Sequence, residues 1–369
     1  MNEMKQIPNV TVETFIKTLG DIYVHVINRQ LPLSLVPTPF VWGPPGVGKS
    51  DGVHQLARYI ERHTGKKVHV TDVRLLLFNP IDLRGIPVAN EDRSLAKWLR
   101  PAVFDMDPGD DVVNILFLDE LTAAPPSVQA AGYQLTLDRK IGEHSLPDNC
   151  IVIGAGNRLT DRSVVHRMPN ALANRMQHYE VIADLESWRR WAIQNQVHPL
   201  VLGYLSFDQS KFYDMENASD ETVFPTPRSW MFVSNLLNIM GDIEDLSTLY
   251  HPISGCIGTG TALAFLSWCK SHADLPDVTD IFRGKRTKYP VRPDALYALT
   301  CSMTAYVENR EKQEGVTEIE LENMTVYANR FPQDYQSCLY SNLCQMKSVE
   351  RKLGKIPLFK QWRRQCDGD

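Results

Sequence analysis

Eight consecutive residues combine glycines with a lysine and a serine at a spacing that suits phosphate binding. They fit the pattern GxxxxGK followed by Ser or Thr, and they are Gly43, Pro44, Pro45, Gly46, Val47, Gly48, Lys49 and Ser50. Glycines let consecutive backbone N–H groups turn inward and hold phosphate oxygens at a helix N-terminus. In such a loop the lysine reaches the β- and γ-phosphates, and the Ser50 hydroxyl binds Mg²⁺. We therefore predict a site for a nucleoside triphosphate, ATP, with magnesium.

Two acidic residues, Asp119 and Glu120, directly follow the apolar run 115–118. Asp119 is predicted to hold Mg²⁺ through water, and Glu120 to polarise an attacking water as a general base. Taken alone, the pair also suits a strand end before a helix, where the helix dipole stabilises acids. Its position after the phosphate loop, in the same predicted sheet, favours the catalytic interpretation.

An asparagine follows the next apolar run, 151–155, as Gly156-Asn157. At the tip of a strand beside the Asp-Glu strand, Asn157 is placed to hydrogen-bond the γ-phosphate and the attacking water. An isolated asparagine here would be read as a turn residue. Its place in the series favours a role in sensing the nucleotide.

The elements that must position these residues alternate between two kinds. Short apolar runs without alternation, at 40–42, 68–73, 115–118, 151–155 and 179–182, are typical of strands buried on both faces of a parallel sheet. Helical patterns lie between them at 51–62 and 126–137. This order predicts a doubly wound α/β domain.

From about residue 185 the strand-like runs fade, and helical patterns take over at 185–194, 227–240, 260–271, 292–308 and 319–331. We predict four regions: an N-terminal helical segment over 1–39, with its helix at 12–29; an α/β core over 40–185; a smaller all-helical lid over 186–310; and a helical C-terminal extension with a basic tail over 311–369. In that tail, a solvated and partly packed helix is favoured over a nucleic-acid or partner-docking surface.

Composition narrows the functional class. The 369 residues are 43% hydrophobic and 22% charged, as in ordinary soluble proteins, and the length favours two domains. The net charge of −5 argues against a protein that mainly grips nucleic acid. The start of the chain does not resemble a secretory signal, and no apolar run is long enough to span a bilayer. The seven scattered cysteines form no CxxC pair, so we expect reduced thiols and a cytoplasmic location.

Together these motifs resemble the AAA+ superfamily of P-loop NTPases, and further segments are similar to its MoxR-like, helix-2-insert branch. Residues 79–87 look like that branch's P-x-D-L-x-G segment, which opens an insert over about 79–101. The resemblance implies a hairpin in this insert and a second hairpin over about 139–147, before the sensor asparagine. It also implies a three-layer core that is followed by the helical lid.

Residues 169–176 look like the family's LPEALLDRF element, although Asn174 and Met176 stand where the family has Asp and Phe. The resemblance makes Arg175 the arginine finger that enters a neighbouring subunit's site. Arg162 and Arg167 are the alternatives. A surface ion-pair role is the other interpretation of Arg175. Because a finger needs a neighbour, this assignment implies a homo-oligomeric ring, which in this family is typically a hexamer.

Residues 224–230 resemble the family's sensor 2 at the start of a lid helix. Thr226 is suited to cap that helix, Pro227 to its first position, and Arg228 then falls in the first turn. The resemblance implies that Arg228 contacts the γ-phosphate from its own subunit and couples the angle of the lid to nucleotide state.

The sequence therefore predicts an Mg-dependent ATP hydrolase in which Lys49, Glu120, Asn157, Arg175 and Arg228 act on the nucleotide. The resemblance implies a ring that remodels or matures a protein client, with a partner that carries a von Willebrand factor A domain. Two alternatives stay open: a slow nucleotide-dependent assembly switch, and a DNA-associated or restriction-type motor, which the acidic charge disfavours. The sequence decides neither ATP against GTP nor the client.

Overall fold

The computed structural model describes residues 7–158, 161, 166, 168–215, 223–241, 245–271, 275–285, 288–313 and 315–367. The predicted alternatives Arg162 and Arg167 lie outside these residues. Packing divides the chain into two units, Met1–Ser187 and Trp188–Asp369. Each unit is described by itself.

The first unit is built on a six-stranded sheet in which every neighbouring pair is parallel. Its strand order is β1-β10-β2-β9-β6-β3. The bounds are β1 (Asn9–Val10), β10 (Gln177–Val181), β2 (Pro39–Trp42), β9 (Cys150–Gly156), β6 (Val112–Asp119) and β3 (Lys67–Arg74). Every residue of β6 and β9 is buried, as expected for central strands covered on both faces. The predicted α/β fold with a parallel sheet is confirmed.

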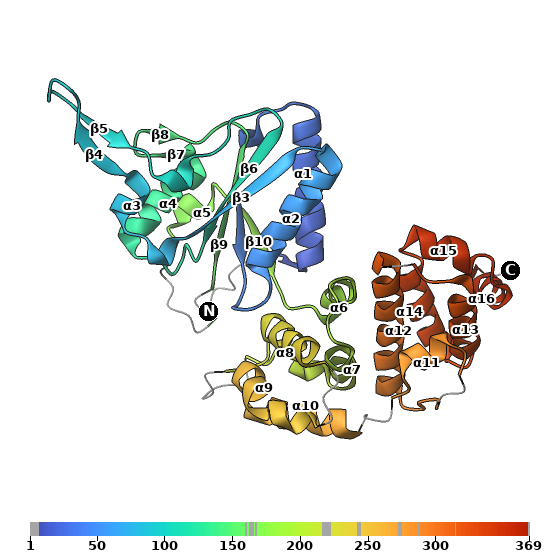
Figure 1. The fold of residues 1–369 in the computed structure, drawn as a ribbon. Helices are drawn as coiled ribbons and strands as arrows, with labels where there is room; N and C mark the ends of the chain where they lie inside the picture. Colours follow the sequence, from blue (N-terminus) through green and yellow to red (C-terminus); the bar gives the residue numbers. More distant parts are fainter. Residues whose placement is uncertain are drawn as a thin grey trace. The chain divides into compact units, whose positions relative to one another are not determined.

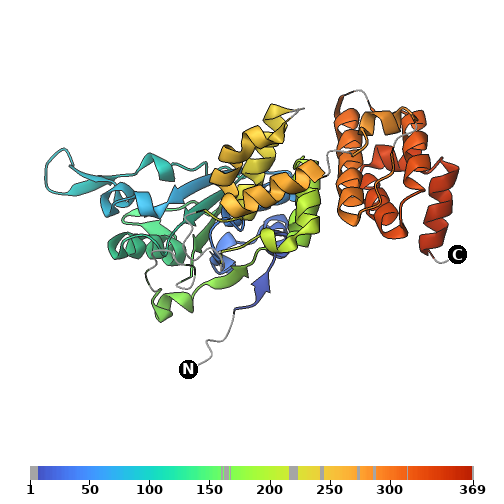
Figure 2. The same ribbon diagram turned by 90° about the horizontal axis from the view of Figure 1, so that it is seen from below.

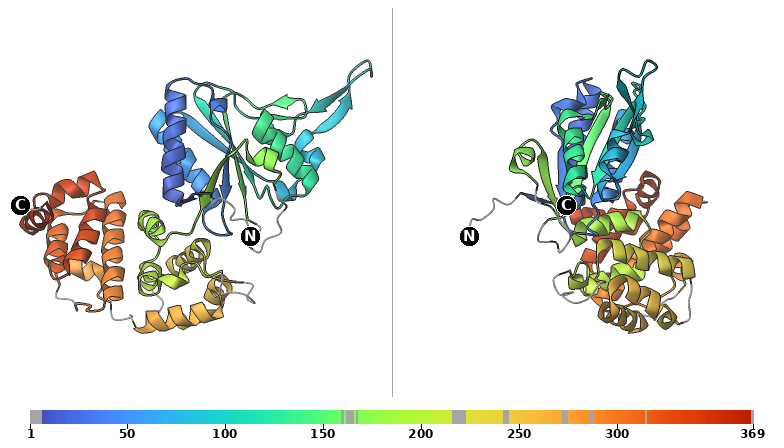
Figure 3. Two further views of the ribbon diagram at one scale, coloured as in Figure 1. Left: turned by 180° about the vertical axis from the view of Figure 1, so that it is seen from behind. Right: turned by 90° about the vertical axis from the view of Figure 1, so that its left-hand side faces the viewer.

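Helices cover both faces of this sheet. Figures 1 and 3 show α1 (Val12–Asn28) and α2 (Lys49–Thr64) on one side, with α3 (Pro80–Arg84), α4 (Pro126–Asp138) and α5 (Asn170–Ala173) on the other. The helix α1 packs closely on α2, since a Cβ on Gly20 would lie 2.5 Å from the Tyr59 ring. The short strand β1, which the sequence did not predict, adds an edge to the sheet beside β10.

Two antiparallel hairpins stand at the positions of the predicted insert and of the predicted second hairpin. The first pairs β4 (Ile86–Ala89) with β5 (Ala96–Leu99), and the second pairs β7 (Lys140–Ile141) with β8 (His144–Ser145). The β4–β5 hairpin projects from the first unit (Figures 1 and 2). Several of its apolar side chains are exposed to solvent: Ile86, Val88, Leu95 and Leu99.

The described residues of the second unit form helices and no strands, which confirms the predicted helical region. From α6, which spans the division between the units, the helices are α6 (Leu185–Gln194), α7 (Pro199–Phe207), α8 (Pro227–Met240), α9 (Tyr250–Ile257), α10 (Thr259–Ser271), α11 (Val278–Phe282), α12 (Pro293–Gln313), α13 (Glu318–Ala328), α14 (Gln333–Leu343), α15 (Lys347–Leu353) and α16 (Pro357–Asp367). Among the described helices, none has the length and apolar character needed to cross a bilayer.

The basic C-terminal helix α16 has a packed face. Phe359 is buried, and the ring of Trp362 lies 4.7 Å from that of Tyr340 on α14. The aromatic residues of the tail therefore belong to a local core, while Arg363 and Arg364 are exposed.

Candidate functional site

The predicted phosphate loop connects the end of β2 to the start of α2. Gly43 has no room for a side chain, because a Cβ there would lie 2.5 Å from the carbonyl oxygen of Val181. Gly48 is the N-cap of α2, adopts the left-handed conformation with φ 102, and makes no capping hydrogen bond from a side chain. The first backbone N–H groups of a helix have no acceptor within it, so an uncapped start suits an anion.

The ammonium group of Lys49 joins the loop to a neighbouring strand. Its Nζ donates to the carbonyl oxygens of Gly43 at 2.6 Å and Pro44 at 3.0 Å. It also donates to Oδ1 of Asn157 at 2.8 Å. Because β2 and β9 are parallel neighbours, their carboxyl ends meet at one edge of the sheet. The structure therefore brings these two predicted residues into direct contact.

Ser50 and Asp119 also meet, and the Ser50 hydroxyl donates to Oδ2 of Asp119 at 2.8 Å. The other oxygen, Oδ1, accepts from the backbone N–H of Glu120 at 2.8 Å. Hydroxyl and carboxylate oxygens suit Mg²⁺, which usually keeps waters and phosphate oxygens as its remaining ligands. No group of three His, Cys, Asp or Glu side chains that could hold a metal occurs among the described residues. The pair fits a magnesium ion brought in with a nucleotide.

Glu120 directly follows the interior strand β6 and has an uncommon backbone conformation. Its φ of 55 is left-handed, which few residues other than glycine adopt. Outliers of this kind cluster at functional sites, where the surrounding structure over-determines them. The residue is half-buried and directly follows Asp119. Its carboxylate is thus carried on a constrained turn next to the Ser50–Asp119 pair.

Asp72 on β3 is a site neighbour that the sequence did not single out. Burial raises the pKa of its carboxyl, and the negative charge of Asp119 raises the pKa further. Its signal in the sequence is an acid inside a predicted buried strand.

Thr122 was also missed, although it holds the backbone of Asn157. Its Oγ1 accepts from the Asn157 N–H at 3.1 Å and donates to the Asn157 carbonyl at 3.2 Å. Thr122 is fully buried, and a Cβ on Gly156 would lie 2.5 Å from its hydroxyl. The threonine therefore fixes the strand tip from which the Asn157 side chain reaches Lys49.

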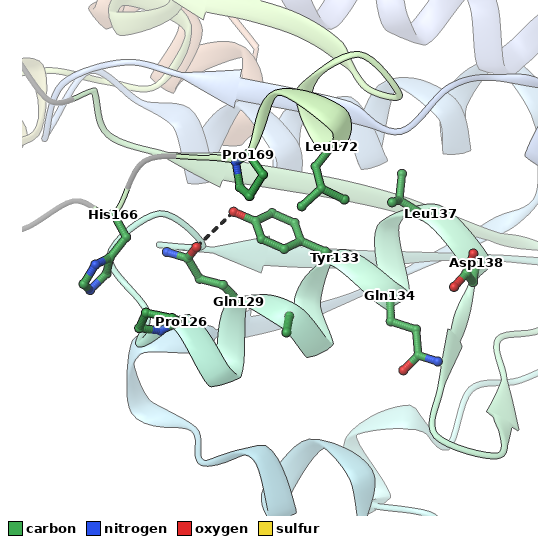
Figure 4. Close-up of a pocket in the computed structure, with 10 residues that line it drawn as sticks. Pro126, Gln129, Tyr133, Gln134, Leu137, Asp138, His166, Pro169 and Leu172 are labelled. Carbon is green, nitrogen blue, oxygen red and sulfur yellow. Dashed lines mark hydrogen bonds between the residues drawn. The ribbon is translucent and has the colours of Figure 1, made fainter.

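A cavity of about 680 Å³ lies beside α4 (Figure 4). Tyr133 donates to Oε1 of Gln129 at 3.0 Å, as the dashed line in Figure 4 marks. Gln129 donates in turn to the carbonyl of Thr122 at 3.1 Å. Burial raises the pKa of Tyr133 to about 12, so its hydroxyl stays protonated at neutral pH. Hydrogen bonds thus link the cavity wall to Thr122 and Asn157.

Arg158, next to the sensor asparagine, is held within its own unit. Its guanidinium pairs with Glu180 on β10 and with Asp161, which lies 3.2 Å away. Its charge is therefore paired within the first unit.

Arg175 lies apart from the phosphate loop cluster, in the turn between α5 and β10. Its side chain is exposed and lines a second cavity of about 510 Å³. Among the described residues, no ion pair or hydrogen bond joins it to Lys49, Asp119 or Glu120. Its action on a neighbouring subunit stays a prediction.

Arg228 belongs to the second unit, where it occupies the first turn of α8. Thr226 caps this helix by accepting from the Ser229 N–H at 3.0 Å, and Pro227 is its first residue, so the predicted capping is confirmed. The Arg228 side chain is exposed. Because its unit is described by itself, its contact with the γ-phosphate stays a prediction.

Comparison with known proteins places a domain in the first unit. Residues 39–183 match the family model described as "ATPase family associated with various cellular activities (AAA)". No curated protein matches the chain. The similarity to AAA ATPases thus covers residues 39–183, within the first unit.

Several solved structures are similar to the chain. A RuvB variant from Thermotoga maritima is 15% identical over 84% of this chain and 89% of that one, with a TM-score of 0.35. NtrX from Brucella abortus in complex with ATP is 14% identical over 95% and 70%, with a TM-score of 0.36. PCH-2 from C. elegans is 13% identical over 71% and 69%, with a TM-score of 0.37.

Proposed function

We propose that the chain is a magnesium-dependent ATPase whose subunits form a ring, typically a hexamer, and remodel or mature a protein partner. The observation that carries the proposal is the position of the Lys49 ammonium, which contacts the loop carbonyls and Asn157 together. Ser50, the residue after Lys49, donates to Asp119. Both residues lie in the segment 39–183 that matches the AAA family model.

In the proposed reaction, Lys49 exchanges its carbonyl partners for the β- and γ-phosphate oxygens of ATP. Backbone N–H groups at the uncapped start of α2 hold the same phosphates. A bound Mg²⁺ would neutralise negative charge that develops on the phosphate oxygens. Ser50 and Asp119 are the residues that would hold it.

Glu120 and Asn157 orient a water for in-line attack on the γ-phosphorus. The water oxygen forms the new bond to phosphorus, the bond to the ADP oxygen breaks, and the Glu120 carboxylate takes up the water proton. Lys49 stabilises the charge on the transferred group from its own subunit. Arg175 of the neighbouring copy supplies a further positive charge. Arg228 contacts the γ-phosphate and so couples the angle of the lid to the nucleotide state.

The ring and its protein client follow from the resemblance to MoxR-like ATPases, and so does a partner with a von Willebrand factor A domain. The side chain of Arg175 is exposed, which is consistent with action on a second copy. The exposed apolar residues of the β4–β5 hairpin offer a surface for a client or partner.

The test is ATP hydrolysis as a function of protein concentration. We expect turnover per subunit to rise with concentration, and to fall roughly 1000-fold in Arg175→Ala, because a finger contributes about 10³–10⁵ to kcat. Glu120→Gln should bind ATP without hydrolysing it. Arg62→Ala, on an exposed helix end, is the matched control and should keep wild-type turnover.

Three results would contradict the proposal. Turnover that is independent of concentration and survives Arg175→Ala would rule out a shared site. Tight ATP binding with no hydrolysis would instead favour the assembly switch, and DNA-stimulated, salt-sensitive turnover would favour the DNA-associated motor.

A further inference from the structure

A histidine on β10 connects the strand that leads into the phosphate loop with the segment that carries Arg175. Trp42 donates its indole N–H to Nδ1 of His178 at 2.8 Å. On the other side of the ring, Nε2 of His178 lies 2.8 Å from the carbonyl oxygen of Ala173. The two rings stack, with centroids 6.0 Å apart and planes inclined by 26°.

These two contacts together allow a single form of the imidazole. An indole N–H can only donate, so Nδ1 of His178 must accept. A carbonyl oxygen can only accept, so Nε2 must carry the proton. His178 is therefore a neutral Nε2–H tautomer, oriented from both sides.

The near end of this connection is the phosphate loop. Trp42 is the last residue of β2, and it is followed directly by Gly43. The Gly43 carbonyl accepts from Lys49 at 2.6 Å. Any adjustment of the loop around bound phosphates therefore begins one residue from the indole.

The far end is the turn that presents Arg175. Ala173 is the last residue of α5, and its carbonyl also accepts from the Met176 N–H at 3.2 Å. Arg175 lies between these two residues, with its side chain exposed. Met176 is buried against the core, so the arginine stands on a short segment held at both sides. The side-chain hydrogen bond from His178 holds the carbonyl of Ala173, where this segment begins.

We infer that His178 is a positioning residue for Arg175. Through its hydrogen bonds with Trp42 and Ala173, His178 connects the phosphate loop of one subunit to the Arg175 of the same subunit. That arginine acts on the site of the neighbouring subunit. This inference rests on the proposed function, since it needs an arginine that acts between subunits. The inference also predicts in which subunit the effect appears. The conformation of the phosphate loop in one subunit affects catalysis in the next subunit more than catalysis in its own subunit.

The test uses two defective chains mixed in the full-length protein. Glu120→Gln cannot hydrolyse ATP but offers an intact Arg175, whereas Arg175→Ala keeps an intact Glu120 but offers no finger. Mixed rings should regain turnover at sites where an Arg175→Ala chain receives the arginine of a Glu120→Gln chain. The first chain is the site donor and the second the arginine donor.

His178→Phe is then added to one chain at a time. Phenylalanine keeps a ring but removes both hydrogen bonds. In the arginine donor we expect the recovered kcat to fall roughly 10- to 100-fold, because a displacement of about 1 Å can cost 10²-fold. In the site donor we expect kcat to stay within about twofold of the unmodified mixture, while the KM for ATP shows any local effect on the loop.

Two companion variants sharpen the result. His178→Gln can accept from Trp42 and donate to Ala173, so it should restore most of the recovered kcat in the arginine donor. Trp42→Phe in the arginine donor removes the donor to Nδ1 and should reproduce part of the loss. Melting temperatures of each chain verify that the variants fold.

An equal loss of kcat from either chain would overturn the inference and assign His178 a general packing role. The same applies if His178→Gln fails to restore activity while folding normally. If the two defective chains recover no turnover before His178 is changed, the shared site itself is wrong, which refutes the proposed function separately.

Discussion

At the scale of single residues, Thr122 is placed to determine how well Asn157 works. Its hydroxyl both accepts from and donates to the Asn157 backbone, and it is fully buried. Through these two hydrogen bonds the threonine acts on the strand tip that carries the Asn157 side chain. Its contribution should therefore appear in kcat as well as in stability.

We predict that Thr122→Val lowers kcat roughly 10- to 100-fold, because the asparagine loses its fixed position. Valine has the same shape but leaves the part-buried Asn157 N–H without its acceptor, which should also lower the unfolding free energy by about 1 kcal/mol. Steady-state kinetics and urea unfolding measure the two effects. Thr122→Ser, which keeps the hydroxyl, is the control. A normal kcat in a destabilised Thr122→Val would limit the threonine to a structural role.

The contrast between predicted and missed residues follows from how far apart the partners lie in the chain. Lys49, Ser50, Asp119 and Asn157 were predictable because each stands in a local pattern of residue types. Thr122 and His178 act through partners 35 and 136 residues away, and no local pattern marks them. Their roles depend on strand neighbours that only the fold brings together.

At the scale of elements, the helix α7 begins with an unusual titratable cap. His198 is its N-cap, and the imidazole Nδ1 accepts from the Leu200 N–H at 3.2 Å. Burial lowers the pKa of His198 from 6.5 to about 4. The cap works only while the imidazole is neutral, because a protonated ring has no acceptor.

This cap should make the stability of the protein depend on pH. Between about pH 6.5 and 4 the unfolded chain binds a proton at His198 and the folded chain does not, so the unfolding free energy falls as pH falls. The loss should be on the order of 2 kcal/mol across this window. His198→Asn keeps a capping acceptor without titrating. Urea unfolding of both proteins at pH 7 and 4.5 should therefore show a smaller drop in the variant, and an equal drop would contradict the prediction.

The elements that the sequence predicted are those with a clear period or a clear apolar run. Helices α6 and α8 begin and end where the sequence placed them. The strand β1 has two residues, too few for a pattern. In α7 the five consecutive residues 201–205 are all buried, so burial extends around the helix and no single apolar face could be recognised.

At the scale of the whole molecule, the proposed catalytic groups are divided between two units. Lys49, Asp119, Glu120 and Asn157 lie in Met1–Ser187, and Arg228 lies in Trp188–Asp369. Phosphate binding and lid response should therefore be separable by mutation.

We predict that Arg228→Ala lowers kcat roughly 100-fold, as the loss of one transition-state donor typically does. Binding of ATP should persist, because the phosphate loop belongs to the other unit. The side chain is exposed, so the melting temperature should stay within a few degrees of wild type. Turnover, nucleotide binding and melting curves are the measurements, and Arg283→Ala, another exposed arginine of the second unit, is the control. Loss of ATP binding in Arg228→Ala would contradict this division.

The strand order of the sheet also has a consequence for how the protein folds during its synthesis on the ribosome. The strand β2, which carries the phosphate loop, has β9 and β10 as its two neighbours, and both are synthesised more than 100 residues later. Contacts between distant parts of a chain form slowly, because the intervening loop must close first. The phosphate loop is therefore translated well before β9 and β10, and β2 lacks both of its neighbouring strands until residue 181 has left the exit tunnel. We therefore expect a newly made chain to bind nucleotide only when synthesis of its first unit is nearly complete.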